Sequence, residues 1–124
     1  MLSLAPLKKT EEVAKFFEAG NLIPNEYSGC VLCKDGDKIL GLCLYDLTDK
    51  KMTVRHIEPI ADLALADGIL RSTLHVAAEK SIMNAFYADT VPESFFEKIG
   101  FIKSKEEKTL DIDKLFSSCQ SCKK

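Results

Sequence analysis

Near the end of the chain stands the stretch ESFFEKIGF, residues 93–101, which decides how the preceding elements are interpreted. Its adjacent phenylalanines put apolar side chains on one face of a short helix. Gly100 can end that helix, because glycine readily adopts the left-handed conformation common after a helix C-terminus. Thr90 can cap the start, and Pro92 suits the first turn, where a missing N–H costs nothing. The stretch therefore predicts a short helix that leads into a strand over Phe101–Ile112.

Two further helices are predicted upstream. The first is expected over Glu11–Ala19, where Val13, Phe16 and Phe17 lie on one face. The second is expected from about Asp67 to Lys80, with Asp67 in a position to cap its start. Its inward-facing stripe consists of Leu70, Leu74, Ala77 and Ala78.

The middle of the chain predicts strands. Three of them, Gly29–Lys34, Lys38–Leu47 and Met52–Glu58, form a plausible antiparallel meander with Asp35-Gly36 as its first turn. A fourth, buried strand is expected over Met83–Ala88. In the third strand, alternation puts one set of side chains on each face: Met52, Val54 and His56 on one, Thr53, Arg55 and Ile57 on the other.

The order of elements predicts an α/β fold. A helix and a three-strand meander are followed by strand, helix, strand, helix and strand, so that a crossover follows the meander and the sheet becomes mixed. The length of 124 residues suits one domain over residues 1–124. Residues 113–124, which include Cys119 and Cys122, are expected to form a flexible tail.

Composition excludes several classes of function. The chain has 17 basic and 19 acidic side chains, a net charge of −2, and no basic stripe of the kind that binds a phosphate backbone. No apolar run is long enough to span a membrane, and the N-terminus does not look like a secretory signal. We therefore expect a cytoplasmic protein that binds neither nucleic acid nor membrane.

The five cysteines include two C-x-x-C pairs, Cys30/Cys33 and Cys119/Cys122. Two such pairs are typical of a zinc site. However, Cys30 and Cys33 are expected on a strand, where positions three apart point to opposite faces. We therefore expect no metal there, although the second pair leaves a redox or metal role open. Cys43 is expected to be a small core residue.

Three stretches resemble the GNAT superfamily of acyl-CoA-dependent N-acetyltransferases. Asp35–Gly41 resembles the hairpin and return strand, and Ile57–Pro59 resembles the fourth strand and its exit toward the cofactor loop. The 93–101 stretch resembles the C-terminal signature A-x-x-F-Y-E-K-x-G-F and is the most specific of the three. The likeness spans roughly Val13 to Asp111 and implies the acyl-CoA N-acyltransferase fold.

The resemblance also implies a site and a reaction. An acyl group would pass from acyl-CoA to an amine of a small molecule or peptide. Glu58 would activate the amine, and Tyr87 or a water would protonate the departing thiolate. The implied cofactor-binding residues are Ile57, Ala66, Asp67, Gly68, Ile69 and Asp89, with helix-terminal N–H groups on the pyrophosphate. The superfamily's habits also suggest a homodimer.

Two departures from the superfamily pattern keep a second class of function open. The loop pattern Q/R-x-x-G-x-G/A is poorly matched by Leu63–Leu70 in either register of Gly68, and the Asp67 carboxylate would repel a phosphate. Phe96 stands at the position of the superfamily's acid tyrosine and cannot give a proton. The alternative is a non-catalytic domain that binds a CoA-like ligand or a protein partner.

Three other residues have side chains capable of site chemistry. His56 and His75 are isolated in the sequence, which is typical of packed or surface histidines. Tyr45 could face the cleft that receives the amine, but tyrosines are common in strands.

Overall fold

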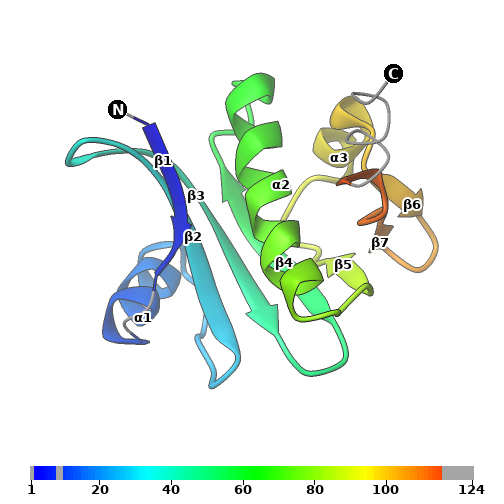
Figure 1. The fold of residues 1–124 in the computed structure, drawn as a ribbon, viewed down its shortest axis with the longest axis horizontal. Coiled ribbons are helices and arrows are strands. Elements are labelled where there is room, and N and C mark those ends of the chain that lie inside the picture. Colours follow the sequence, from blue (N-terminus) through cyan, green and yellow to red (C-terminus); the bar gives the residue numbers. More distant parts are fainter. Residues whose placement is uncertain (1, 8–9, 116–124) are drawn as a thin grey trace.

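One mixed β-sheet organises residues 2–7 and 10–115, the part of the chain that this computed structural model describes (Figure 1). The strand order is β1-β2-β3-β4-β5-β7-β6; β4 and β5 are parallel, and the other neighbours are antiparallel. The strands are β1 (Leu2–Pro6), β2 (Ser28–Asp35), β3 (Lys38–Leu47), β4 (Met52–Glu58), β5 (Ala85–Tyr87), β6 (Ile102–Ser104) and β7 (Thr109–Leu110). The helices are α1 (Thr10–Ala19), α2 (Leu63–Glu79) and α3 (Glu93–Ile99). The predicted α/β fold with a mixed sheet is confirmed.

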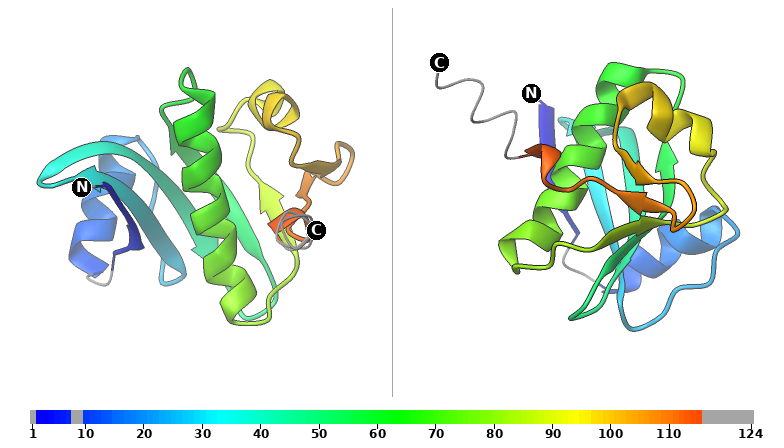
Figure 2. Two further views of the ribbon diagram at one scale, coloured as in Figure 1. Left: turned by 45° about the horizontal axis from the view of Figure 1, so that its top comes forward. Right: turned by 90° about the vertical axis from the view of Figure 1, so that its right-hand side faces the viewer.

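Helices cover both faces of the sheet (Figures 1 and 2). Helix α1 packs Val13 and Phe17 against one face, and we call it the α1 face; its buried partners are Cys30, Leu32, Leu42 and Leu44. Helices α2 and α3 pack against the opposite face, the α2 face, in a second cluster that includes Leu70, Leu74 and Phe96. Each face therefore has its own hydrophobic core.

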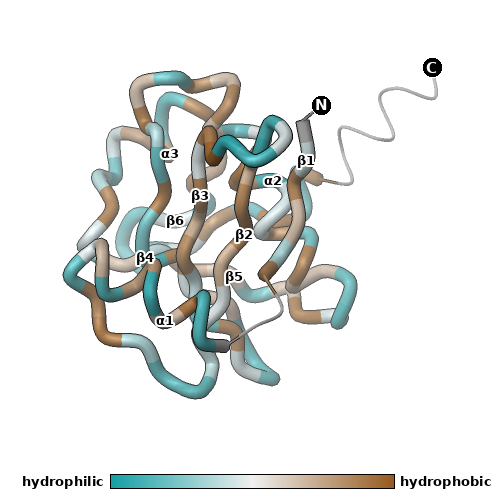
Figure 3. Tube along the Cα trace, turned by 90° about the vertical axis from the view of Figure 1, so that its left-hand side faces the viewer, coloured by the Kyte–Doolittle hydropathy of each residue, from teal (hydrophilic) through white to brown (hydrophobic). Residues whose placement is uncertain are grey.

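The central strands are apolar along most of their length (Figure 3). Residues 29–33 of β2 are all buried, because helices cover the strand on both sides. Cys30 belongs to the α1-face core and Cys33 to the α2-face core, so they lie on opposite faces of the strand, as predicted. The two thiols therefore point away from each other. Among the described residues, no cluster of His, Cys, Asp and Glu could hold a metal ion.

Helix α2 begins earlier than predicted. It starts at Leu63, not near Asp67, and its N-cap is Asp62, whose Oδ1 accepts a hydrogen bond of 3.1 Å from the Leu65 N–H. Four helical residues, Leu63–Ala66, precede Asp67. The prediction failed because Asp67 also resembles a cap, whereas the earlier aspartate follows Pro59 and meets the first free N–H groups.

Other elements also differ from the prediction. Strand β1 was not predicted; it pairs with β2 from Leu2↔Asp35 to Pro6↔Val31. The single last strand is divided into β6 and β7. Helix α3 has Pro92 as its N-cap with no side-chain cap bond, so Thr90 does not cap it. Gly100 does end α3, with φ of +74°.

A β-bulge in β4 reverses half of its predicted face pattern. The pairing passes from Tyr45↔Val54 to Leu44↔His56, so Arg55 is an extra residue. Beyond it, Ile57 joins the α2-face core, whereas His56 lies with α1-face residues such as Phe16. Simple alternation placed both residues on the wrong face, because an inserted residue shifts the phase of every later side chain.

The chain after β7 returns to α3. Lys114 Nζ donates hydrogen bonds of 2.9 Å each to the carbonyl oxygens of Ile99 and Gly100, and lies 4.6 Å from the Phe101 ring centroid. A cation suits this place because the carbonyls at a helix C-terminus carry partial negative charge. The predicted tail residues Cys119 and Cys122 lie outside the described residues. No helix within the described ranges is long and apolar enough to cross a bilayer.

Candidate functional site

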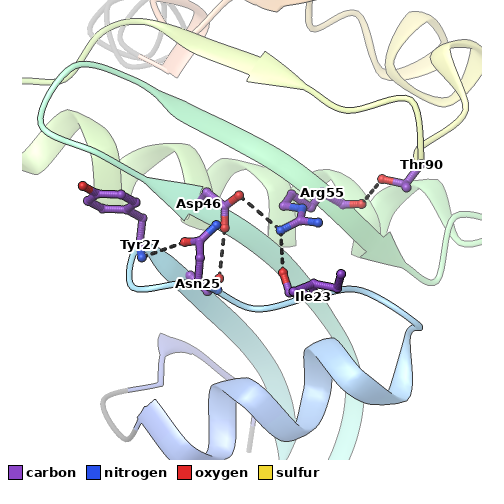
Figure 4. A network of polar contacts seen from close by, with 7 residues as sticks. Ile23, Asn25, Tyr27, Asp46, Arg55 and Thr90 are labelled. Carbon is purple, nitrogen blue, oxygen red and sulfur yellow. Dashed lines mark hydrogen bonds and ion pairs between the residues drawn. The ribbon is translucent and has the colours of Figure 1, made fainter.

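The parallel strands β4 and β5 separate halfway along β4. They pair from Met52↔Ala85 to Val54↔Tyr87, and a 2.9 Å bond from the Ala88 N–H to the Val54 carbonyl follows. Strand β4 then continues to Glu58 without a β5 partner. The Thr90 hydroxyl donates a hydrogen bond to the Arg55 carbonyl just beyond the last pair (Figure 4). The gap between the strands therefore opens from the bulge onward, with Thr90 at its near end.

A groove of about 390 Å³ lies on the α1 face beside this gap, and we call it the α1 groove. Its lining comes from the end of α1, from β3 and from β4: Phe16, Ala19, Gly20, Ile39, Leu42, His56 and Glu58. Its two ionisable side chains form a pair, with His56 Nε2 2.7 Å from Glu58 Oε1. The bulge puts both in the groove, because it turns His56 and Glu58, which share one face of β4, toward α1.

This pair has the properties of a proton acceptor. Glu58 is 58% exposed and His56 32%, so water and ligands can reach both. A carboxylate that is hydrogen-bonded to an imidazole can take a proton from a nearby group and share it with the ring. Glu58 was predicted as the base from the resemblance, whereas His56 was assigned to packing or surface. The register of β4 with β3 was the missing information.

Tyr87, the other predicted catalytic residue, lies on the opposite face. It is 4% exposed in the α2-face core, and its ring centroid is 4.7 Å from that of Phe96. Its hydroxyl donates a 2.8 Å hydrogen bond to Glu93 Oε2. Burial, together with the Glu93 carboxylate, raises the pKa of Tyr87 to about 12. The structure therefore does not bring Tyr87 and Glu58 together. Tyr45 is likewise buried in the α2-face core.

The predicted cofactor-binding residues are dispersed. The side chains of Ile57, Ala66 and Ile69 are at most 3% exposed and belong to the α2-face core. Asp67 Oδ2 accepts a 2.9 Å hydrogen bond from Arg71 Nε. Gly68 lies between Asp67 and Ile69 inside α2, and Asp89 pairs with Lys108 on the surface.

The N-terminus of α2 fits a pyrophosphate poorly. Asp62 places a carboxylate there and takes up the Leu65 N–H, and the Ala66 N–H donates to the Asp62 carbonyl. The connection from β4, residues 59–62, contains no glycine that would let a phosphate approach the backbone. The end of β4 has no partner on its β5 side, so an extended ligand could pair with this strand edge.

A polar network that the sequence did not reveal holds the bulge (Figure 4). Arg55 Nη1 donates to the Ile23 carbonyl at 3.0 Å and to Asp46 Oδ2 at 3.3 Å, and Ser28 Oγ donates to Asp46 Oδ1 at 3.0 Å. The guanidinium also lies 5.5 Å from the Phe17 ring centroid. The network fastens the α1–β2 loop to β4 next to the α1 groove. A lone arginine in a strand was the only available signal.

Comparison with known proteins identifies the fold. No protein-family model and no curated protein sequence matches the chain. Several solved structures match it in fold. A ribosomal-protein-alanine N-acetyltransferase of Brucella melitensis biovar Abortus 2308 has a TM-score of 0.56 at 16% identity, over 80% of this chain and 90% of that one.

Two further structures agree. A GNAT-family acetyltransferase of Streptococcus pneumoniae TIGR4 has a TM-score of 0.54 at 18% identity, over 82% of this chain and 88% of that one. A predicted acetyltransferase of Clostridium acetobutylicum, solved with acetyl-CoA, has a TM-score of 0.57 at 13% identity, over 86% and 93%. Likeness at such identities concerns the fold, and this chain has the fold of the GNAT N-acetyltransferases.

Proposed function

We propose that this protein is an N-acyltransferase that moves an acyl group from an acyl-CoA to an amine of a small molecule or peptide. The His56–Glu58 pair carries the proposal, because it sets a proton acceptor in a groove beside the parting of β4 and β5. The GNAT fold supports it, since the three structures compared above, which share the fold, are acetyltransferases.

The proposed reaction needs two proton transfers. The amine must lose a proton as its nitrogen bonds to the thioester carbonyl carbon, and Glu58 takes that proton directly or through a water. His56 stabilises the protonated Glu58 carboxyl group, because the two side chains can share the proton through their hydrogen bond. The C–S bond then breaks, and the thiolate needs a proton. We assign that step to solvent water, because the Tyr87 hydroxyl is buried on the α2 face and donates its hydrogen bond to Glu93.

The test is acyl transfer by a Glu58→Gln variant. Thiol release from acetyl-CoA is followed with a panel of amines, and we expect kcat/KM to fall by roughly 10²–10⁴-fold in the variant. Glu79→Gln is the matched control, because Glu79 Oε1 lies 2.9 Å from His75 Nδ1 in a similar exposed pair on α2. Equal activity in the two variants would exclude Glu58 as the base.

A second candidate is a non-catalytic domain that binds a CoA-like ligand or a protein partner, such as a second copy of the chain. Asp62 at the α2 N-terminus favours it, because the carboxylate opposes an anionic ligand there. Phe96, buried in the α2-face core, also favours it. The absence of thiol release with every amine, despite saturable CoA binding, would select this candidate.

We propose the cytoplasm as the working compartment. Cys30, Cys33 and Cys43 are buried and free, and such thiols are typical of reducing compartments. Fractionation of cells that express a tagged chain tests this.

A further inference from the structure

The α1 groove combines apolar walls with one acidic group. Phe16, Ala19, Ile39 and Leu42 supply the walls, and Glu58 supplies the only carboxylate among the described residues of the lining. The volume of about 390 Å³ is near the lower end of ordinary ligand sites. A ligand of this size buries most of its surface, so its chemistry must match the walls.

The apolar wall is partly uncovered in the structure. Ile39 is 44% exposed although it stands in a strand, and Phe16 is only half-buried. An apolar group seated in the groove would remove these side chains from water, which is favourable in proportion to the area covered. A sugar or a polyamine chain would bring polar groups to walls that cannot hydrogen-bond with them.

The charged side chains of the lining narrow the class of ligand further. Within the described part of the chain, His56 is the only basic residue that lines the groove, and its ring is hydrogen-bonded to Glu58. The described lining therefore offers a ligand carboxylate no lysine or arginine. A free amino acid would therefore bring its carboxylate close to Glu58, and like charges repel. A polyamine would place its second ammonium group beside apolar walls. One ammonium group beside Glu58 matches the single carboxylate.

From these observations we infer that the α1 groove selects an apolar monoamine, an alkylamine or arylalkylamine without a carboxylate or a second cationic group. The inference rests on the proposed function for its role as the acyl acceptor. Its recognition chemistry rests on the groove alone, namely an ammonium group at Glu58 and an apolar body against Phe16, Ile39 and Leu42.

Binding is tested first, without any acyl donor. Amide NMR spectra of the protein are titrated with phenethylamine, spermidine and phenylalanine, and with 2-phenylethanol as the uncharged analogue. Phenethylamine is expected to bind at least about tenfold more tightly than the other three. This difference in affinity corresponds to one ion pair or one buried apolar group. The shifts are expected at Ala19, Gly20 and His56. Equal or tighter binding of spermidine or phenylalanine would overturn the inference.

Two variants locate the site. Glu58→Gln should weaken phenethylamine about tenfold and leave 2-phenylethanol unchanged. Ile39→Thr should weaken both, whereas Ile60→Thr is the matched control, because Ile60 is 41% exposed and not in the groove lining. Shifts that map elsewhere, or equal effects of the two isoleucine variants, would show that the groove is not the amine site.

Acyl transfer separates this inference from the proposed function. Thiol release from acetyl-CoA is compared among the same amines and a peptide with an apolar N-terminal residue. Phenethylamine binding in the groove without turnover would sink the proposed function and leave the binding inference standing. Turnover that favours spermidine, phenylalanine or the peptide over phenethylamine would support acyl transfer and overturn the substrate class.

Discussion

Glu58 and Tyr87 come from adjacent strands, but they differ in exposure to water and in how readily they exchange a proton. The two residues come from β4 and β5, which pair as far as Val54↔Tyr87. Glu58 faces solvent in the α1 groove, whereas Tyr87 is buried on the α2 face beside Glu93. Water can reach the carboxylate but hardly reaches the phenol. The tyrosine therefore has the properties of a structural residue, and its proton is held tightly.

The raised pKa of Tyr87 predicts a pH dependence of stability. The pKa is about 12 in the folded protein and near 10 in an unfolded chain. The folded state keeps the proton longer, so the stabilisation is complete below pH ~10 and is lost as pH rises toward ~12. Tyr87→Phe should flatten this loss, and it should cost about 0.5–1.5 kcal/mol at pH 7 through the lost bond to Glu93. Urea unfolding between pH 7 and 11 measures both.

Tyr45 serves as the comparison, because burial also raises its pKa to about 12. The wild-type protein and Tyr87→Phe share the Tyr45 contribution, so their difference isolates Tyr87. Parallel stability curves for the two proteins above pH 9 would contradict a raised pKa at Tyr87.

At the scale of elements, the start of α2 decides how an anion is received. The helix N-terminus offers free N–H groups and partial positive charge, which ordinarily attract phosphates. Asp62 occupies that position with its own carboxylate. The same residue thus stabilises the helix and opposes a pyrophosphate. The acyl donor, if bound, must rely more on the edge of β4.

Asp62→Asn tests this balance. Asparagine caps helices about as well as aspartate, so stability should change by less than about 0.5 kcal/mol. The negative charge is gone, and we expect CoA to bind about three- to tenfold more tightly at low salt, with a smaller gain at 0.5 M salt because of screening. Isothermal titration measures the affinities.

Asp62→Ala separates the charge from the cap. It also removes the charge, but it should cost about 1 kcal/mol because the Leu65 N–H loses its acceptor. Unchanged CoA affinity in both variants would mean that the ligand does not approach this helix end.

At the scale of the whole molecule, β1 forms one edge of the sheet and lies next to the long strand β2. Strand β1 covers the edge of β2, and it also contacts α2. Without it, the long apolar strand β2 would form the edge of the sheet, and such an edge pairs readily with another chain. Strand β1 thus covers the edge of β2, and we expect it to limit the pairing of β2 with another chain.

Removal of residues 1–6 should therefore have two effects. We expect the free energy of unfolding to fall by on the order of 2 kcal/mol or more, because several backbone hydrogen bonds to β2 are lost. We also expect dimers or larger species in size-exclusion chromatography with light scattering. Leu4→Lys is the control, since it keeps the strand and changes only a side chain that is 42% exposed. A monodisperse, equally stable truncated chain would contradict this role of β1.

Local patterns predicted much of the fold. The Asp35-Gly36 turn, the apolar face of α1 and the end of α3 at Gly100 all depend on neighbours a few residues away, and each is present in the structure. Glu58 was also singled out from the sequence, through a resemblance that the fold bears out. These features were accessible because turn chemistry, helical spacing and a glycine with positive φ act within one segment.

Only the tertiary structure decided which residues meet. The bulge at Arg55 arises from pairing with β3 and from bonds to Asp46 and the Ile23 carbonyl, all distant in sequence. It turns His56 and Glu58 together to the α1 face, and so separates Glu58 from Tyr87. The start of α2, with Asp62 rather than Asp67 as its cap, was also seen only in the structure. The sequence by itself determined most of the elements and their order, though neither β1 nor the division into β6 and β7, because local conformational preferences are written in each segment. The composition of the site required the packed sheet, since a shift of one residue in register exchanges the faces of every side chain that follows.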